Sequence, residues 1–186
     1  MPDARPPEPV LPVTLMRVRD KLHFLERHRK LIAGCGLICL LTVLANHYRL
    51  SMAVGESMLP TLNTGDLLLV DKLVYQNTDP RRGDIVVVRS RKELIVKRVV
   101  GLPGEEVEVI NGTLSIDGAP QMEDHKIRLG PLTIAKGKLL EGRFAVLGDN
   151  RALPLPQIVH AIVSKDQILG KVIFPIRLAW LRRSET

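Results

Sequence analysis

Two side chains in this sequence, the hydroxyl of Ser57 and the amine of Lys97, have the types that acyl transfer requires. Ser57 lies in GESMLPTL, residues 55–62, and Lys97 lies in an apolar, strand-like run at 94–100. Strand alternation gives Lys97 apolar neighbours on its own face. Burial there would lower the pKa of the amine from about 10.4 to roughly 7–8, at a cost of roughly 3–4 kcal/mol. A neutral amine can serve as the general base for a serine nucleophile. The alternative is a lysine that extends from the end of a core strand to solvent.

Other catalytic arrangements find less support. The sequence has no Gly-x-Ser-x-Gly elbow. A Ser-His-Asp triad would have to use His125 or His160, and no surrounding motif supports either residue. There is no His-Glu-x-x-His pattern or comparable ligand cluster, so the sequence predicts neither a metal site nor a cofactor. Cys35 and Cys39, one helical turn apart in an apolar run, predict no disulfide framework.

The N-terminal part predicts a membrane anchor. Five prolines in residues 1–13 predict a disordered leader, and residues 15–30 predict a polar helix. Residues 31–45 contain no charged side chain, and mildly polar residues extend this segment to 49. Its length is near the lower limit of the roughly 17–25 residues that a spanning helix needs. The alternative is a signal peptide that is cleaved after Val43-Leu44-Ala45.

The charge around this segment predicts its orientation. Basic residues precede the apolar run, so the positive-inside rule places residues 1–30 in the cytoplasm, 31–49 in the inner membrane and 50–186 outside. The net charge is +7, but the basic residues are not interleaved with aromatic ones, and no zinc-finger or RNA-binding signature is present. A membrane surface therefore explains the charge better than nucleic acid does. The sequence does not predict an oligomeric state.

The region after residue 49 predicts a mostly β domain. Asn111-Gly112 between two alternating runs is a strong hairpin signal, because both residues accept positive φ angles. Residues 118–142 are polar and predict a loop without chemistry. The predicted strands cover residues 67–70, 85–88, 94–100, 107–110, 113–116, 144–147 and 168–174.

Four motifs resemble those of type I signal peptidases in order and spacing. They are GESMLPTL at 55–62, RGDIV at 82–86, KRVVGLPG at 97–104 and GDNR at 148–151. The resemblance covers about residues 50–112 and 144–174. It implies a signal-peptidase-like β catalytic domain outside the membrane, with Ser57 as nucleophile and Lys97 as general base.

The resemblance also implies roles for the residues around this dyad. Some family members carry a serine two residues before the nucleophile as an oxyanion donor, but this chain has Gly55 there, which leaves the backbone N–H of Ser57 as the main donor. The residues expected at the oxyanion and substrate sites are Gly55, Met58, Leu59 and Pro60. Those expected to support the site are Asp149, Asn150 and Arg151, with an ion pair between Asp149 and Arg151.

The chain departs from the family pattern after Arg151. Family members follow GDNR with Ser-x-Asp-Ser-Arg, whose first serine helps to position the lysine. Counting without a gap places Pro154, Pro156 and Ile158 at the positions of that Ser, Asp and Arg. Lys97 therefore lacks its expected hydroxyl partner, and Ser164 is the nearest later hydroxyl.

The leading hypothesis is a membrane-anchored serine endopeptidase that removes signal peptides from exported preproteins, cutting after small residues near the lipid bilayer. One alternative is a maturation peptidase dedicated to a pilin or conjugation protein. Soluble self-cleaving repressors also use Ser/Lys dyads, but the membrane segment counts against them. The alternative from a different class is a catalytically impaired, membrane-anchored binding module, which the altered segment after Arg151 favours.

Overall fold

A computed structural model describes residues 13–90, 93–123, 125–154 and 161–176. The chain divides into two units, Met1–Ala45 and Asn46–Thr186. Helix α1 spans Val13–His47 without a break, so residues 15–30 and the apolar run form one helix instead of the two expected segments. The helix ends at His47, and the next element, a strand, begins at Tyr48.

Within α1, one segment is long and apolar enough to cross a membrane. It covers His28–His47, has a mean hydropathy of 1.6, and is not buried inside the protein. Apolar side chains such as Leu31, Ile38 and Leu41 are each more than half exposed. A helix whose apolar residues find no protein partner is suited to a lipid environment. The proline-rich leader predicted at residues 1–13 lies almost entirely outside the described residues.

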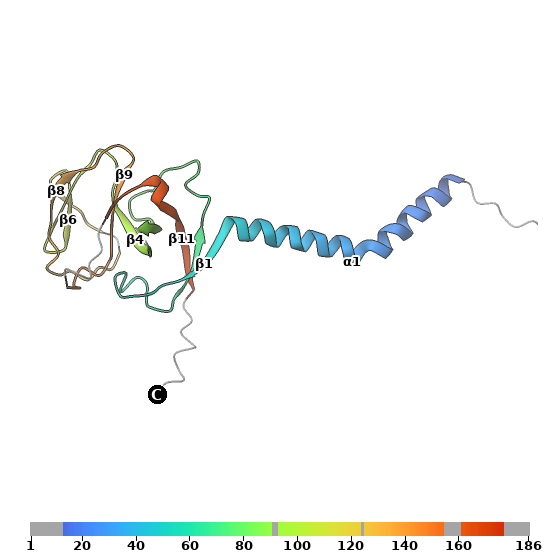
Figure 1. The fold of residues 1–186 in the computed structure, drawn as a ribbon, viewed down its shortest axis with the longest axis horizontal. Coiled ribbons are helices and arrows are strands. Elements are labelled where there is room, and N and C mark those ends of the chain that lie inside the picture. The colour runs from blue at the N-terminus through green and yellow to red at the C-terminus, as the bar shows by residue number, and fades with distance from the viewer. Residues whose placement is uncertain (1–12, 91–92, 124, 155–160, 177–186) are drawn as a thin grey trace, which may run out of the picture. The chain divides into compact units, whose positions relative to one another are not determined.

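The second unit contains two antiparallel sheets (Figure 1). The larger sheet has the order β1-β2-β11-β3-β4-β9-β10, and the smaller one has the order β7-β6-β5-β8. The strands of the larger sheet are β1 (Tyr48–Met52), β2 (Leu67–Asp71), β3 (Ile85–Ser90), β4 (Glu93–Gly101), β9 (Arg143–Leu147), β10 (Ala161–Ser164) and β11 (Ile168–Ile176). Those of the smaller sheet are β5 (Glu106–Ile110), β6 (Thr113–Ile116), β7 (Ala119–Pro120) and β8 (Ile134–Lys138), and a 3-10 turn, η2 (Lys165–Gln167), precedes β11.

The prediction of a mostly β domain is confirmed, and each predicted strand is present. Asn111 and Gly112 form the expected turn between β5 and β6 with φ angles of 47° and 79°. The prediction of a loop over residues 118–142 is wrong, because β7 and β8 lie there. Their residues are mostly exposed, so they lack the apolar alternation that identifies a strand in sequence.

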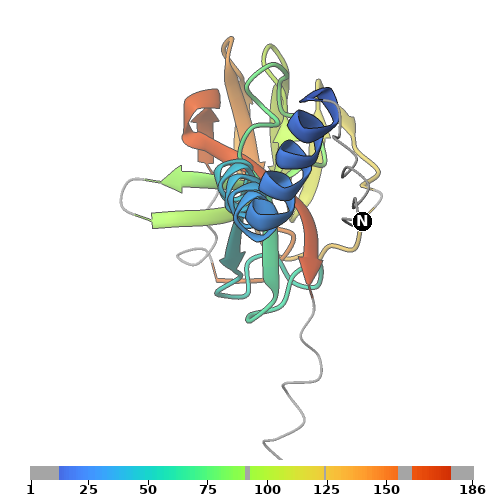
Figure 2. The ribbon, with the colours of Figure 1, turned by 90° about the vertical axis from the view of Figure 1, so that its right-hand side faces the viewer.

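Strand β4 lies where the apolar clusters of the second unit meet. Val100 belongs to a cluster under the smaller sheet, Val99 to a second cluster with Phe144, and Val96 packs at the edge of a third around Met58. The N-terminal part of β4 pairs with β3, whereas β9 pairs with β4 only from Arg98 onward. The β3–β4 hairpin therefore projects beyond the neighbouring strands (Figure 2). In the described part of the chain, the edge of β4 that faces away from β3 has no strand partner before Arg98.

Candidate active site

Ser57 lies in a turn that is fixed at both ends. Ala53 donates its N–H to the carbonyl of Asp66 at 2.9 Å and accepts one from Gly65, which ties the end of β1 to the segment before β2. Met58 and Leu62 are 5% and 1% exposed and anchor the turn in an apolar cluster. The hydroxyl of Ser57 is therefore presented by a turn that buried side chains anchor on its C-terminal side.

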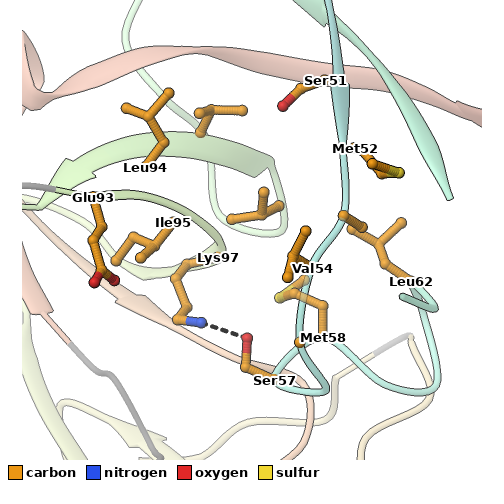
Figure 3. Close-up of a pocket in the computed structure, with 14 residues that line it drawn as sticks. Ser51, Met52, Val54, Ser57, Met58, Leu62, Glu93, Leu94, Ile95 and Lys97 are labelled. Atoms are coloured by element: carbon orange, nitrogen blue, oxygen red, sulfur yellow. Dashed lines mark hydrogen bonds between the residues drawn. The ribbon is translucent and has the colours of Figure 1, made fainter. Parts of the chain in front are cut away.

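Lys97 lies in the middle of β4, and its amine meets the hydroxyl of Ser57. The Nζ donates to the Oγ at 2.6 Å, and Lys97 is only 3% exposed (Figure 3). Burial lowers the pKa of the amine to about 8, although the charge of Asp149 acts in the opposite direction. The expected burial and pKa shift of Lys97 therefore agree with the structure, and the alternative of a lysine extended to solvent does not.

The pair lies in a groove of about 490 Å³. Apolar and polar residues both line it, and Val54 beside the pair is 82% exposed. Of the four residues expected at the oxyanion and substrate sites, Gly55 and Met58 line the groove, whereas Leu59 and Pro60 do not. The lining residues are Ser51, Met52, Ala53, Val54, Gly55, Ser57, Met58, Leu62, Val87, Glu93, Leu94, Ile95, Val96 and Lys97.

The GDNR turn is hydrogen-bonded to the backbone of the Ser57 turn. Asn150 donates its backbone N–H to the carbonyl of Ser57 at 3.0 Å and its side-chain amide to the carbonyl of Glu56 at 3.1 Å. Gly148 packs so closely that a Cβ at this position would overlap the carbonyl oxygen of Ser57. The glycine is therefore required for the two turns to approach one another.

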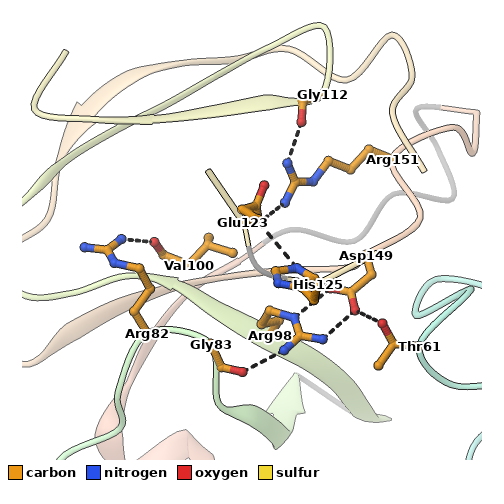
Figure 4. A network of polar contacts seen from close by, with 10 residues as sticks. All are labelled: Thr61, Arg82, Gly83, Arg98, Val100, Gly112, Glu123, His125, Asp149 and Arg151. Atoms are coloured by element: carbon orange, nitrogen blue, oxygen red, sulfur yellow. Dashed lines mark hydrogen bonds and ion pairs between the residues drawn. The ribbon is translucent and has the colours of Figure 1, made fainter. Parts of the chain in front are cut away.

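Asp149 is buried and takes Arg98 as its ion-pair partner. The guanidinium donates to both carboxylate oxygens, at 2.9 and 2.7 Å, and the hydroxyl of Thr61 donates to one of them at 2.5 Å (Figure 4). The predicted ion pair between Asp149 and Arg151 is wrong. Arg151 instead donates to Glu123 at 2.6 Å and to the carbonyl of Gly112 at 2.5 Å.

Sequence reasoning missed four residues of this network: Thr61, Arg98, Glu123 and His125. Arg98 follows Lys97, so strand alternation already placed it on the opposite face of β4, where its charge would need a partner. Glu123 and His125 fall in the region predicted to be a loop without chemistry, and no sequence pattern distinguishes them there.

Of the three residues at the positions of the missing Ser, Asp and Arg, the structure describes Pro154, which is exposed. Pro156 and Ile158 lie outside the described residues. Ser164 donates to Gln167 beside η2. Among the described residues, the hydroxyl that contacts the Lys97 amine is that of Ser57, and no group of three His, Cys, Asp or Glu side chains is arranged to hold a metal ion.

A mostly β domain that presents a serine hydroxyl to a buried amine has the arrangement of a serine hydrolase with a lysine base. Comparison of this chain with known proteins identifies its family. The family model for signal peptidase, peptidase S26, matches residues 28–178. The chain therefore belongs to the signal peptidase family, which is a family of serine hydrolases.

Two relatives in sequence agree with this assignment. A signal peptidase I from Leptolyngbya laminosa is 36% identical over 159 residues, which cover 77% of this chain and 78% of that protein. A signal peptidase I from Bacillus caldolyticus is 35% identical over 158 residues, which cover 77% of this chain and 85% of that protein. A crystal structure of a signal peptidase I from Enterococcus faecalis aligns with a TM-score of 0.42 and 27% identity, covering 51% of this chain and 97% of that one.

Proposed function

We propose that Ser57 is the nucleophile and Lys97 the general base with which this signal peptidase removes N-terminal signal peptides from exported preproteins. The observation that carries the proposal is the 2.6 Å contact between the buried amine and the hydroxyl at the groove. That distance lies within the range of about 2.6–3.2 Å over which a base can take a proton from a nucleophile. The retained contact also counts against an inactive binding module.

The reaction follows from these two groups. The neutral amine of Lys97 takes the proton of Ser57 as its Oγ attacks the scissile carbonyl. The resulting ammonium then gives that proton to the leaving amine, which becomes the new N-terminus of the mature protein. The acyl-enzyme ester on Ser57 is hydrolysed by a water that Lys97 deprotonates, and the hydroxyl is regenerated.

The groove supports an extended substrate. In the described part of the chain, residues 94–97 of β4 present an unpaired strand edge to it, and a peptide that adds to a sheet edge is held by main-chain hydrogen bonds. Met58 and Val96 border the groove and favour a small, apolar side chain next to the scissile bond. Gly55 has no hydroxyl, so the backbone N–H of Ser57 is the proposed main oxyanion donor.

The pH dependence of preprotein processing tests this proposal. Only the neutral amine is active, so kcat/KM is expected to fall about tenfold per pH unit below the Lys97 pKa of about 8 and to level off above it. The measurement is cleavage of a purified preprotein by the detergent-solubilised chain between pH 6 and 10. A flat profile from pH 6 to 9 would exclude this base, and no cleavage of any preprotein would favour the binding module.

The chain is also proposed to be anchored in the inner membrane, with residues 1–30 in the cytoplasm, 31–49 as the anchor and 50–186 outside. The apolar helix segment supports an anchor. Leu50, Met52 and Val54 alternate directly after it and are 62%, 58% and 82% exposed, which favours contact of this surface with lipid.

Cysteine labelling in intact cells tests the orientation. After Cys35 and Cys39 are replaced by alanine, Thr113→Cys is expected to react with a membrane-impermeant maleimide, because Thr113 is exposed in the domain placed outside. Lys30→Cys, on the cytoplasmic side, is expected to react only after the cells are opened. The reverse pattern would invert the proposed orientation.

A further inference from the structure

We propose that Glu123 and His125 are positioning residues for the peptidase reaction, and that the backbone of residues 128–130 holds the GDNR turn against Ser57. The inference rests on the proposed roles of Ser57 and Lys97. It assigns to the region after β7 a bracing role for the GDNR turn.

The backbone of this segment is bonded directly to the GDNR turn. Arg128 donates its N–H to the carbonyl of Asp149 at 2.9 Å, and Arg151 donates its N–H to the carbonyl of Arg128 at 2.7 Å. These bonds form a parallel bridge between Arg128 and Asn150. Gly130 lies so close that a Cβ there would overlap the carbonyl of Arg151. The turn is therefore enclosed between the Ser57 turn and residues 128–130.

Glu123 supplies the negative charge that the buried Arg151 needs. The Arg151 side chain is 1% exposed and donates to the Glu123 carboxylate at 2.6 Å, and that carboxylate is itself only 8% exposed. A buried cation without a partner is strongly destabilising. Removing the charge of Glu123 is therefore expected to displace Arg151 and, with it, the end of the GDNR turn.

The imidazole of His125 lies between the two buried ion pairs. Its Nε2 lies 3.5 Å from a carboxylate oxygen of Glu123 and 3.5 Å from one of Asp149 (Figure 4). Burial and the charge of Arg98 lower the pKa of His125 below its usual range, against the influence of both carboxylates. The imidazole is therefore neutral near pH 7, and it fills the space between the pairs without adding charge to them.

The hydrogen bonds of this network extend to the turn that carries Ser57 but not to the substrate groove. Asp149 is bonded to Thr61, and Asn150 to the carbonyls of Glu56 and Ser57, so a shift of the GDNR turn moves the turn that carries the hydroxyl. A misplacement of about 1 Å can cost about 10²-fold in rate. Neither Glu123 nor His125 lines the substrate groove. The loss is therefore expected in kcat and not in KM.

The test compares Glu123→Gln and His125→Asn with Lys126→Gln, which changes an exposed neighbour. Both positioning variants are expected to lower kcat for a signal-peptide substrate about tenfold, with KM within twofold of wild type, and Lys126→Gln to change neither constant. Thermal unfolding of each variant is recorded, and kcat is measured well below every midpoint. If Glu123→Gln does not fold, His125→Asn carries the test, because it leaves both ion pairs intact.

Two results would overturn the inference while leaving the proposed function intact: kcat within twofold of wild type in the folded variants, or a rise in KM at unchanged kcat. Failure of the proposed function is distinguishable from both, because wild type would then process no substrate or Ser57→Ala would process it equally well. That outcome overturns the inference as well, since no reaction would remain for these residues to position.

Discussion

Ser57→Ala is expected to lower kcat/KM for preprotein cleavage by at least about 10⁴-fold, because it removes the atom that forms the acyl-enzyme. The groove and the backbone N–H of residue 57 remain, so the variant should still bind substrate with a KM or Kd near that of wild type. Cleavage is measured by the appearance of the mature N-terminus, and binding by competition against a labelled signal peptide.

The matched control for this substitution is Ser115→Ala on β6, which removes a partly buried hydroxyl from the smaller sheet, away from the groove. It is expected to leave kcat/KM within twofold of wild type. Processing by Ser57→Ala at even a tenth of the wild-type rate would rule out Ser57 as the nucleophile.

Lys97→Met is expected to reduce kcat/KM by about 10³-fold or more, because the hydroxyl of Ser57 loses its base while the methionine keeps most of the apolar volume. The residual rate should no longer follow the ionisation at about pH 8. The measurement is the pH–rate profile of the variant, determined with an enzyme concentration high enough for single-turnover conditions.

The same substitution is expected to stabilise the fold. The pKa of Lys97 is about 8 in the folded state against 10.5 in the unfolded chain, so below pH 8 the folded state holds a buried charge. This difference destabilises the wild type by about 3 kcal/mol below pH 8. After a loss of about 1 kcal/mol for the hydrogen bond to Ser57, Lys97→Met should raise the free energy of unfolding at pH 7 by about 2 kcal/mol.

The pH dependence of this stability difference provides a second test. The unfolded chain binds more protons than the folded one between pH 8 and 10.5, so wild-type stability should rise through that interval and the advantage of Lys97→Met should shrink. Lys138→Met, which removes an exposed lysine of β8, is the control and should change neither activity nor stability appreciably. A destabilised Lys97→Met at pH 7 would contradict the depressed pKa.

Lys97 is positioned at Ser57 despite the altered residues after Arg151. The altered residues after Arg151 imply a lysine without its usual hydroxyl support, yet the amine is 3% exposed and 2.6 Å from Ser57. The neighbouring Val96 and Val99 of β4 pack in apolar clusters, and the GDNR turn next to Ser57 is hydrogen-bonded to the backbone of Arg128. In the part of the chain that the structure describes, these contacts support the pair.

The sequence by itself determined the features that depend on local pattern. The apolar run gave a helix, alternation gave the core strands, and Asn111-Gly112 gave the hairpin, because each signal lies within a few residues. The apolar face of β4 was enough to predict a buried Lys97 with a lowered pKa. The four motifs were enough to indicate the family.

Only the tertiary structure decided which charged groups meet. Asp149 and Arg151 are two residues apart, which favours a pair between them, but Asp149 pairs with Arg98 on β4 and Arg151 with Glu123 beyond β7. Such pairs join residues about 30 to 50 positions apart, and the choice among them depends on how strands and turns from both sheets pack. Sequence spacing carries no information about that packing, because a buried charge takes the partner that the fold brings within reach.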